Sequence, residues 1–194
     1  MNAYLLARLI ASFLIGSIPF AVVAMWGTGI DVRQAGSRNP GFNNVLRVGT
    51  KWRAVIALVG DVGKGTATLA LLSSPGDRAA ILWSLGLAAV LGHCFSPFLG
   101  FNGGKGVATT VGVLLFLDWP ITVAALPLYP ILRTFGRRRG WAQEGAIASL
   151  VTMTVITLAV LAIRGPEAGA FAALMLAVVA LRHRANLEEV LFAR

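Results

Sequence analysis

Residues 145–163 read GAIASLVTMTVITLAVLAI, nineteen positions without a charged side chain. A helix that crosses the hydrocarbon core of a bilayer needs about 20 apolar residues. The whole chain is 57% hydrophobic and only 13% charged, whereas a soluble domain carries about 25% charged residues. We therefore expect an all-α polytopic membrane protein, with residues 1–194 forming a single transmembrane domain.

The apolar segments predict about seven transmembrane helices. The candidate spans are 4–26, 53–73, 79–96, 106–118, 120–133, 145–163 and 167–182. The first is long for the core of a signal peptide and lacks a clear cleavage site, so we expect it to be retained. Residues 107–132 could form one helix or two. Asp118-Trp119-Pro120 favours a turn, because proline disfavours helix at the residue before it.

The net charge of +9 is best explained by membrane topology, and we expect no nucleic acid partner. With seven helices, 13 of the 17 Lys and Arg residues fall on one face and 3 on the other, while Lys64 lies inside a span. Cytoplasmic loops concentrate Lys and Arg. This distribution predicts an external N-terminus and a cytoplasmic C-terminus.

A polar loop follows the first apolar run, with the sequence SRNPGFNNVLR over residues 37–47. Ser37 and the asparagines offer hydrogen-bonding groups, and the Arg47 guanidinium suits phosphate. The loop could instead cap a helix, with Arg47 serving only topology. We favour ligand binding, because loops carry functional residues disproportionately.

A second loop, FNGGKG over residues 101–106, precedes another apolar run. Its glycines allow backbone N–H groups to turn toward a ligand, and Lys105 adds a positive charge. The N-terminus of a helix that follows would also favour an anion. The Walker spacing is absent, because Gly106 follows Lys105 where Ser or Thr is required. The loop could bind phosphate or form only a flexible turn.

Two further pairs of polar residues are each three positions apart, so on a helix the members of a pair would share one face. His183 and Asn186 could bind one oxyanion together, or belong to a basic stop signal after the last span. Asp61 and Lys64 lie inside the second span, where charges are costly, usually paired and often functional. They could form a structural ion pair or take part in function. No Cys/His cluster has metal-ligand spacing, so we expect no metal site.

Five motifs follow one another in a specific order along nearly the whole chain. They are Gly16-Ser17-Ile18-Pro19, the loop 37–47, Asp61-Val62-Gly63-Lys64-Gly65, the segment 92–109, and Arg182-His183 through Asn186. Taken together, these motifs resemble the bacterial acyl-phosphate-dependent glycerol-3-phosphate acyltransferases, the PlsY family.

The resemblance implies a seven-helix enzyme of the bacterial inner membrane, with its motifs facing the cytoplasm. The implied reaction moves a fatty acyl group from acyl phosphate to the sn-1 hydroxyl of glycerol 3-phosphate. Its products are lysophosphatidic acid and phosphate, in phospholipid biosynthesis. The expected partners are these two substrates and membrane lipid. No metal or nucleotide cofactor is implied, and we expect a monomer.

The resemblance also implies the site residues. The phosphate of glycerol 3-phosphate would be held by the catalytic residues Ser37, Arg47, Lys105, His183 and Asn186. The acyl phosphate would be received by the backbone around Gly103, Gly104 and Gly106. Further substrate contacts are expected from Asn39, Asn43, Asn44 and Thr109.

The chain departs from the family pattern at three positions. Arg38 stands where glycine is usual, Asn43 where threonine is usual, and Ala146 where a first serine is usual. A divergent paralogue with another donor or acceptor is therefore one alternative. A transporter or flippase for an anionic phosphorylated metabolite is another, because broken helices and glycine loops occur in transporters. The gathering of the polar clusters on one face favours the enzyme.

Overall fold

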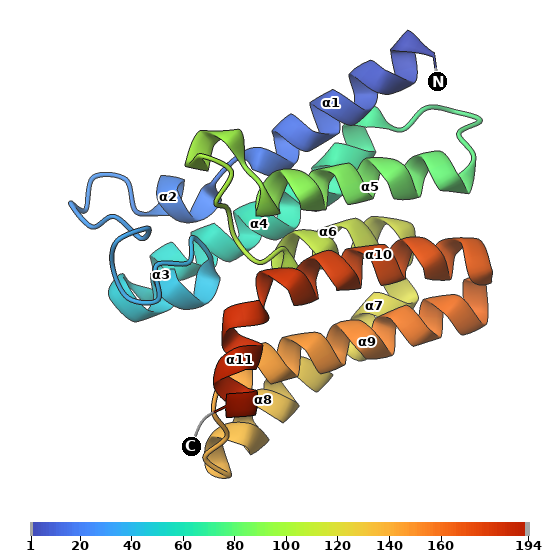
Figure 1. The fold of residues 1–194 in the computed structure, drawn as a ribbon. Coiled ribbons are helices and arrows are strands. Elements are labelled where there is room, and N and C mark those ends of the chain that lie inside the picture. The colour runs from blue at the N-terminus through green and yellow to red at the C-terminus, as the bar shows by residue number, and fades with distance from the viewer. Residues whose placement is uncertain (1, 193–194) are drawn as a thin grey trace. The chain divides into compact units, whose positions relative to one another are not determined.

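The computed structural model describes residues 2–192, and the regular elements within them are all helical. The chain divides into two compact units, unit 1 (Met1–Phe116) and unit 2 (Leu117–Arg194) (Figure 1). Among the described residues, four helical stretches are long and apolar enough to cross a membrane, namely Ala3–Ala24, Lys51–Leu72, Ala79–Leu99 and Glu144–Arg164. A fifth candidate joins Pro166–Arg182 to Arg184–Phe192 through a bend of 64°.

Unit 1 is arranged around one central helix, α4. Its elements are α1 (Ala3–Ser17), α2 (Phe20–Ala24), α3 (Phe42–Val48), α4 (Lys51–Leu72), α5 (Ala79–Cys94), the 3-10 helix η1 (Pro97–Leu99) and α6 (Val107–Leu117). Helix α4 contacts α1, α2, α3 and α5. The predicted span 4–26 corresponds to the candidate span Ala3–Ala24, which is divided into α1 and α2. Pro19 has no N–H to donate and disfavours helix at Ile18, so α1 ends at Ser17.

Glycines let the helices of unit 1 approach one another closely. A Cβ added at Gly16 of α1 would lie 2.1 Å from the carbonyl oxygen of Ala89 in α5. A Cβ added at Gly112 of α6 would lie 1.9 Å from the carbonyl oxygen of Val62 in α4. Small residues at helix contacts are typical of membrane proteins, in which van der Waals packing between backbones drives association.

The start of α1 is tied to the loop between α4 and α5. The Arg8 guanidinium pairs with both carboxylate oxygens of Asp77 and donates to the Leu72 carbonyl at 2.7 Å. The Tyr4 and Ser74 hydroxyls are hydrogen-bonded at 3.0 Å. The N-terminus of α1 and this loop therefore lie at the same end of unit 1.

Unit 2 is built on the long helix α9. Its elements are α7 (Trp119–Ala125), α8 (Leu128–Arg138), α9 (Glu144–Arg164), α10 (Pro166–Arg182) and α11 (Arg184–Phe192). Helix α9 packs against α7, α8 and α10. The predicted turn near Asp118 is confirmed, because α6 ends at Leu117 and α7 begins at Trp119.

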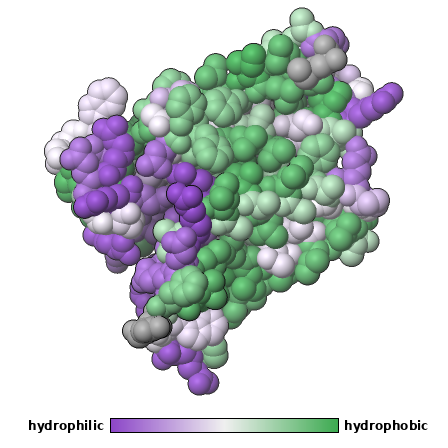
Figure 2. Space-filling view, viewed as in Figure 1, coloured by the Kyte–Doolittle hydropathy of each residue, from purple (hydrophilic) through white to green (hydrophobic). Residues whose placement is uncertain are grey.

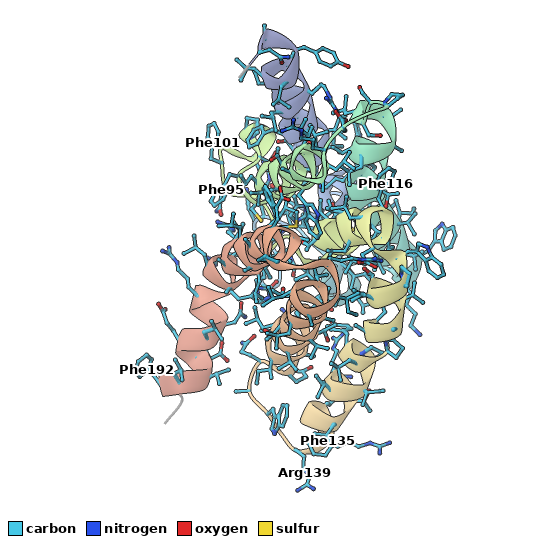
Figure 3. The ribbon with its side chains drawn as sticks, turned by 90° about the vertical axis from the view of Figure 1, so that its right-hand side faces the viewer. Phe95, Phe101, Phe116, Phe135, Arg139 and Phe192 are labelled. Carbon is cyan, nitrogen blue, oxygen red and sulfur yellow. The ribbon has the colours of Figure 1, made fainter. Side chains whose placement is uncertain are left out.

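The predicted span 120–133 is not one continuous helix, because Pro127 separates α7 from α8. Helix α8 continues to Arg138 and includes Arg133, Arg137 and Arg138. Figure 3 shows Phe135 and Arg139 near this end, where the Arg139 guanidinium carbon lies 5.2 Å from the Phe135 ring centre.

Helices α7 and α8 together run along the length of α9. At one end, Arg164 of α9 donates to Asp118, the residue before α7, at 2.6 Å. At the other end, Arg133 and Arg137 of α8 lie 3.8 and 3.7 Å from Glu144 at the start of α9. The broken pair therefore reaches both ends of a helix that is long enough to span a membrane.

The surface carries the hydropathy pattern of a membrane protein. Figure 2 shows extended hydrophobic surface over the helices. In unit 1, hydrophilic residues gather around α3 and the loop that precedes it. This loop contains the first polar cluster predicted from the sequence.

Candidate active site

Asn44 of α3 organises the first polar loop. Its side chain is only 1% exposed. The amide oxygen accepts a hydrogen bond from the Ser37 backbone N–H at 2.8 Å, and the amide nitrogen donates to the carbonyls of Val32 and Ala35 at 2.9 and 3.0 Å. The side-chain oxygen and nitrogen of Asn44 are thus both hydrogen-bonded to the loop backbone. Direct contact between Asn44 and a substrate stays a prediction, and its role in the loop was not predicted.

The organised loop exposes the side chains expected to bind an anion. Ser37 is exposed, and Arg47 is exposed in the last turn of α3. Asn43 is exposed on α3, whereas Asn39 is half-buried just before that helix. Arg38 has a φ of 58°, a left-handed conformation that favours glycine, which explains why glycine is usual at this position.

The second loop folds back onto the end of α5. The Gly103 N–H donates to the Cys94 carbonyl and the Gly104 N–H donates to the His93 carbonyl, both at 3.1 Å. Phe95 and Phe101, labelled in Figure 3, flank this turn in the sequence. Both predicted glycine N–H groups therefore have carbonyl partners in this conformation.

The groups suited to an anion lie further along the same loop. The Gly106 carbonyl accepts from the Thr110 N–H at 2.8 Å, so Gly106 caps α6, which begins at Val107, two residues after Lys105. The first N–H groups of a helix have no intrahelical acceptor and carry the positive end of its dipole. Lys105 and the start of α6 would suit an anion, and their contact with phosphate stays a prediction.

Thr109 lies in the first turn of α6 but is fully buried. A Cβ added at Gly65 of α4 would lie 2.4 Å from the Thr109 carbonyl oxygen. Among the described residues, the Thr109 hydroxyl has no hydrogen-bond partner. Thr109 therefore lies at the contact between α4 and α6, and its predicted contact with a substrate is not tested.

Asp61 and Lys64 form an ion pair, which is one of the two alternatives that the sequence left open. The Lys64 ammonium lies 2.8 Å from the Asp61 carboxylate and donates to the Ile18 carbonyl at 2.7 Å. His93 joins the pair, with its Nδ1 3.5 Å from the same carboxylate. The cluster therefore connects the break after α1 with α4 and with the end of α5.

The pair of His183 and Asn186 differs from its predicted geometry. His183 lies at the bend between α10 and α11, so it and Asn186 do not share one regular helix. His183 Nδ1 lies 2.8 Å from the Val179 carbonyl oxygen. Asn186 donates to the side-chain oxygen of Gln143 at 2.6 Å, and Gln143 donates to Glu189 at 2.5 Å.

Gln143 was not predicted as a site residue. It lies in the left-handed region with a φ of 55°, just before α9, and nothing in the local sequence indicates its contact with Asn186. His183 and Asn186 belong to unit 2, whereas Ser37, Arg47 and Lys105 belong to unit 1. Their convergence on one substrate stays a prediction.

Comparison with known proteins agrees with these features. Residues 6–193 match the family model described as glycerol-3-phosphate acyltransferase. A glycerol-3-phosphate acyltransferase of Jannaschia sp. is 41% identical over 182 residues, which cover 92% of this chain and 85% of the relative. The corresponding protein of Brucella ovis is 38% identical and that of Mesorhizobium japonicum 35%. Each alignment covers 98% of this chain, with 91% and 94% of the relatives.

The fold is also similar to solved structures of PlsY (YgiH), an integral membrane glycerol 3-phosphate acyltransferase. Its glycerol 3-phosphate form superposes with a TM-score of 0.86 at 31% identity, and its lysophosphatidic acid form with 0.84 at 30%. Both comparisons cover 98% of this chain and 93% of the other.

Proposed function

Because the chain belongs to the glycerol-3-phosphate acyltransferase family, we propose that its donor is acyl phosphate and that the sn-1 hydroxyl is acylated. The products are then lysophosphatidic acid and inorganic phosphate. The observation that supports this choice of donor is the position of Lys105 in the chain, two residues before the first residue of α6, so that a cationic side chain adjoins the N-terminus of a helix. Such groups can bind the phosphate of the donor and can also stabilise that phosphate as it leaves.

The proposed chemistry needs no nucleophile from the protein. Acyl phosphate is a mixed anhydride, so its phosphate is already a good leaving group. Alignment of two bound reactants can lower the barrier by about 7–11 kcal/mol at the limit of ideal orientation. Lys105 and the α6 N-terminus stabilise the negative charge that develops on the carbonyl oxygen and the departing phosphate. Ser37, Arg47, Lys105, His183 and Asn186 hold glycerol 3-phosphate, so Lys105 serves both substrates.

The attacking hydroxyl must lose a proton, and we assign this step to a phosphate oxygen of the substrate. His183 is the rival base. Its Nδ1 is engaged with the Val179 carbonyl, so its Nε2 is the nitrogen that would accept a proton. Single-turnover measurements on His183→Gln separate the two. Near-normal chemistry at saturating substrates is expected, whereas a large loss would assign the base to His183.

We infer seven crossings, with the site on the cytoplasmic face and the N-terminus outside. The pairing of Asp118 with Arg164, and of α8 arginines with Glu144, supports α7 and α8 as one broken crossing beside α9. The contact of Asn186 with Gln143 supports a common side for the C-terminal cluster and the loop before α9. Helix α6, with 11 residues, is then a short crossing.

The reaction is tested by measuring phosphate release from purified protein given palmitoyl phosphate and glycerol 3-phosphate. Release that requires both substrates, and that is lost in Lys105→Ala, is expected. Lys51→Ala is the matched control, because Lys51 is an exposed lysine at the start of α4. Release without glycerol 3-phosphate would indicate only hydrolysis. Equal release by both lysine variants would remove Lys105 from the site.

A further inference from the structure

The cluster of Asp61, Lys64 and His93 is buried but lies directly against the second loop. The exposed fractions of these three residues are 2%, 4% and 7%. An ion pair inside a membrane protein carries a desolvation cost, and apolar residues of similar volume would often be as stable. Stability alone therefore does not explain why three ionisable groups lie together at this place.

The cluster links three segments of unit 1. Lys64 donates to the carbonyl of Ile18, at the proline break after α1, and also pairs with Asp61. Asp61 in turn faces His93 Nδ1 in the last turn of α5. One break and two helices are thereby joined through a single carboxylate.

The other ring nitrogen of His93, Nε2, faces the turn formed by Gly103 and Gly104. A Cβ added at Gly104 would lie 2.2 Å from His93 Nε2, so the Gly104 backbone packs directly on the imidazole ring. The His93 carbonyl also accepts the Gly104 N–H. The position of this ring therefore limits where Gly104 lies, and Lys105 follows it in the chain.

A second link holds the same region. Ser96, two residues after α5, donates to the Ser17 carbonyl at 2.7 Å, and the Ser17 hydroxyl donates to the Gly92 carbonyl at 3.2 Å. The break after α1 is thus hydrogen-bonded on both sides of His93. The cluster and these serines together leave the end of α5 little freedom to shift.

We propose that Asp61, Lys64 and His93 are positioning residues that hold the Gly103–Gly104 turn, and with it Lys105 and the start of α6, in the geometry that receives the phosphate group of the acyl donor. This role rests on the proposed site at Lys105. None of the three residues is required to touch a substrate. Their contribution is the placement of the turn.

The central test compares single and double substitutions. Asp61→Asn and Lys64→Met each leave one buried charge without its partner, so each should destabilise the protein. The double variant Asp61→Asn/Lys64→Met removes both charges and should recover most of the melting temperature. Its kcat/KM should nevertheless stay roughly 10- to 100-fold low, because small misplacements of a catalytic group can cost about 100-fold. Recovery of both properties would overturn the proposal.

Hydrogen–deuterium exchange gives a readout that does not depend on activity. The Gly103 and Gly104 amides are hydrogen-bonded to the end of α5, so they should be protected in the unsubstituted protein. The double variant and His93→Gln should exchange these amides faster while peptides from the middle of α4 stay protected. Unchanged exchange in the turn would overturn the proposal.

The Arg8–Asp77 pair is the matched control, because it is another buried ion pair in unit 1. Arg8→Met/Asp77→Asn should leave both kcat/KM and exchange of the glycine turn unchanged. An equal loss of activity there would overturn a specific role for the Asp61 cluster. The variant Lys105→Ala distinguishes failure of the proposed site from failure of the positioning role. If that variant is inactive while Asp61→Asn/Lys64→Met is fully active, the site holds and the positioning role fails.

Discussion

At the scale of single residues, Asn44 shows how one buried amide can determine a binding loop. It makes three hydrogen bonds to backbone groups between Val32 and Ser37. These bonds satisfy polar groups that would otherwise be buried without partners. The exposed position of Ser37 therefore depends on a side chain seven residues later.

We predict that Asn44→Ala lowers the free energy of unfolding by about 2–3 kcal/mol, because several backbone groups lose their partner. The acyltransferase rate should also fall, since Ser37 is no longer held. Thermal unfolding in detergent and kcat/KM measure the two effects. Gln34→Ala, an exposed change in the same loop, is the control. Equal melting temperatures for the two variants would contradict this role.

A second residue-scale prediction concerns acid. Arg8 and the Ser74 N–H donate hydrogen bonds to Asp77 and hold the pKa of its carboxyl below the usual range. A group with a lowered folded pKa stabilises the protein fully above its unfolded pKa, about 3.9 for Asp. This contribution is lost as the pH falls through the lower folded value.

The melting temperature of Asp77→Asn should therefore lie below that of the parent protein at neutral pH. The gap should narrow only below about pH 4, where the carboxyl of the parent becomes protonated. Unfolding followed across this pH range measures the effect. Asp31→Asn is the control, since the Asp31–Arg33 pair is on the surface and should contribute little. A gap that widens in acid would refute the assignment.

At the scale of elements, close helix contacts in unit 1 depend on particular glycines. Gly65 and Gly63 lie two residues apart in α4. A Cβ at Gly65 would lie 2.4 Å from a backbone oxygen of α6, whereas a Cβ at Gly63 would meet nothing within 4 Å. The same substitution therefore has opposite consequences on the two faces of one helix.

We predict that Gly65→Ala destabilises unit 1 by about 1–3 kcal/mol, because α4 and α6 are forced apart. Gly63→Ala should be neutral or stabilise the protein by up to about 1 kcal/mol, since alanine favours helix. Unfolding of both variants in the same detergent provides the comparison. A larger loss of stability in Gly63→Ala than in Gly65→Ala would contradict the close contact between α4 and α6.

At the scale of the whole molecule, the number of crossings depends on α7 and α8. Two crossings between residues 107 and 138 place Arg139 on the side of the first polar loop. One crossing places it on the side of Arg78. Our proposal of two crossings rests on the contacts of α7 and α8 with both ends of α9.

This topology predicts the labelling of single cysteines by a membrane-impermeant maleimide. In a Cys94→Ser background, Arg78→Cys should be labelled in intact cells. Arg33→Cys and Arg139→Cys should be labelled only after permeabilisation. All three replaced arginines are exposed, and the native Cys94 is buried. Labelling of Arg139→Cys together with Arg78→Cys would refute the seven-helix arrangement.

The sequence by itself determined the helical membrane class and most apolar segments, and its spacing offered an ion pair of Asp61 with Lys64 as one of two alternatives. Proline also marked the turn near Asp118, and explains the breaks at Pro19 and Pro127 that the predicted spans overlooked. These features follow from hydropathy, spacing and backbone chemistry within a few residues, so they can be read locally. The motif order was specific enough to indicate the family.

Only the tertiary structure assigned Asn44 to the loop backbone, His93 to the Asp61 cluster and Gln143 to Asn186. It also gave the Gly103 and Gly104 N–H groups their carbonyl partners. Each of these contacts joins groups that are seven or more residues apart in the sequence. Any of several polar side chains could satisfy such a group, and the packing of the helices selects which one reaches it.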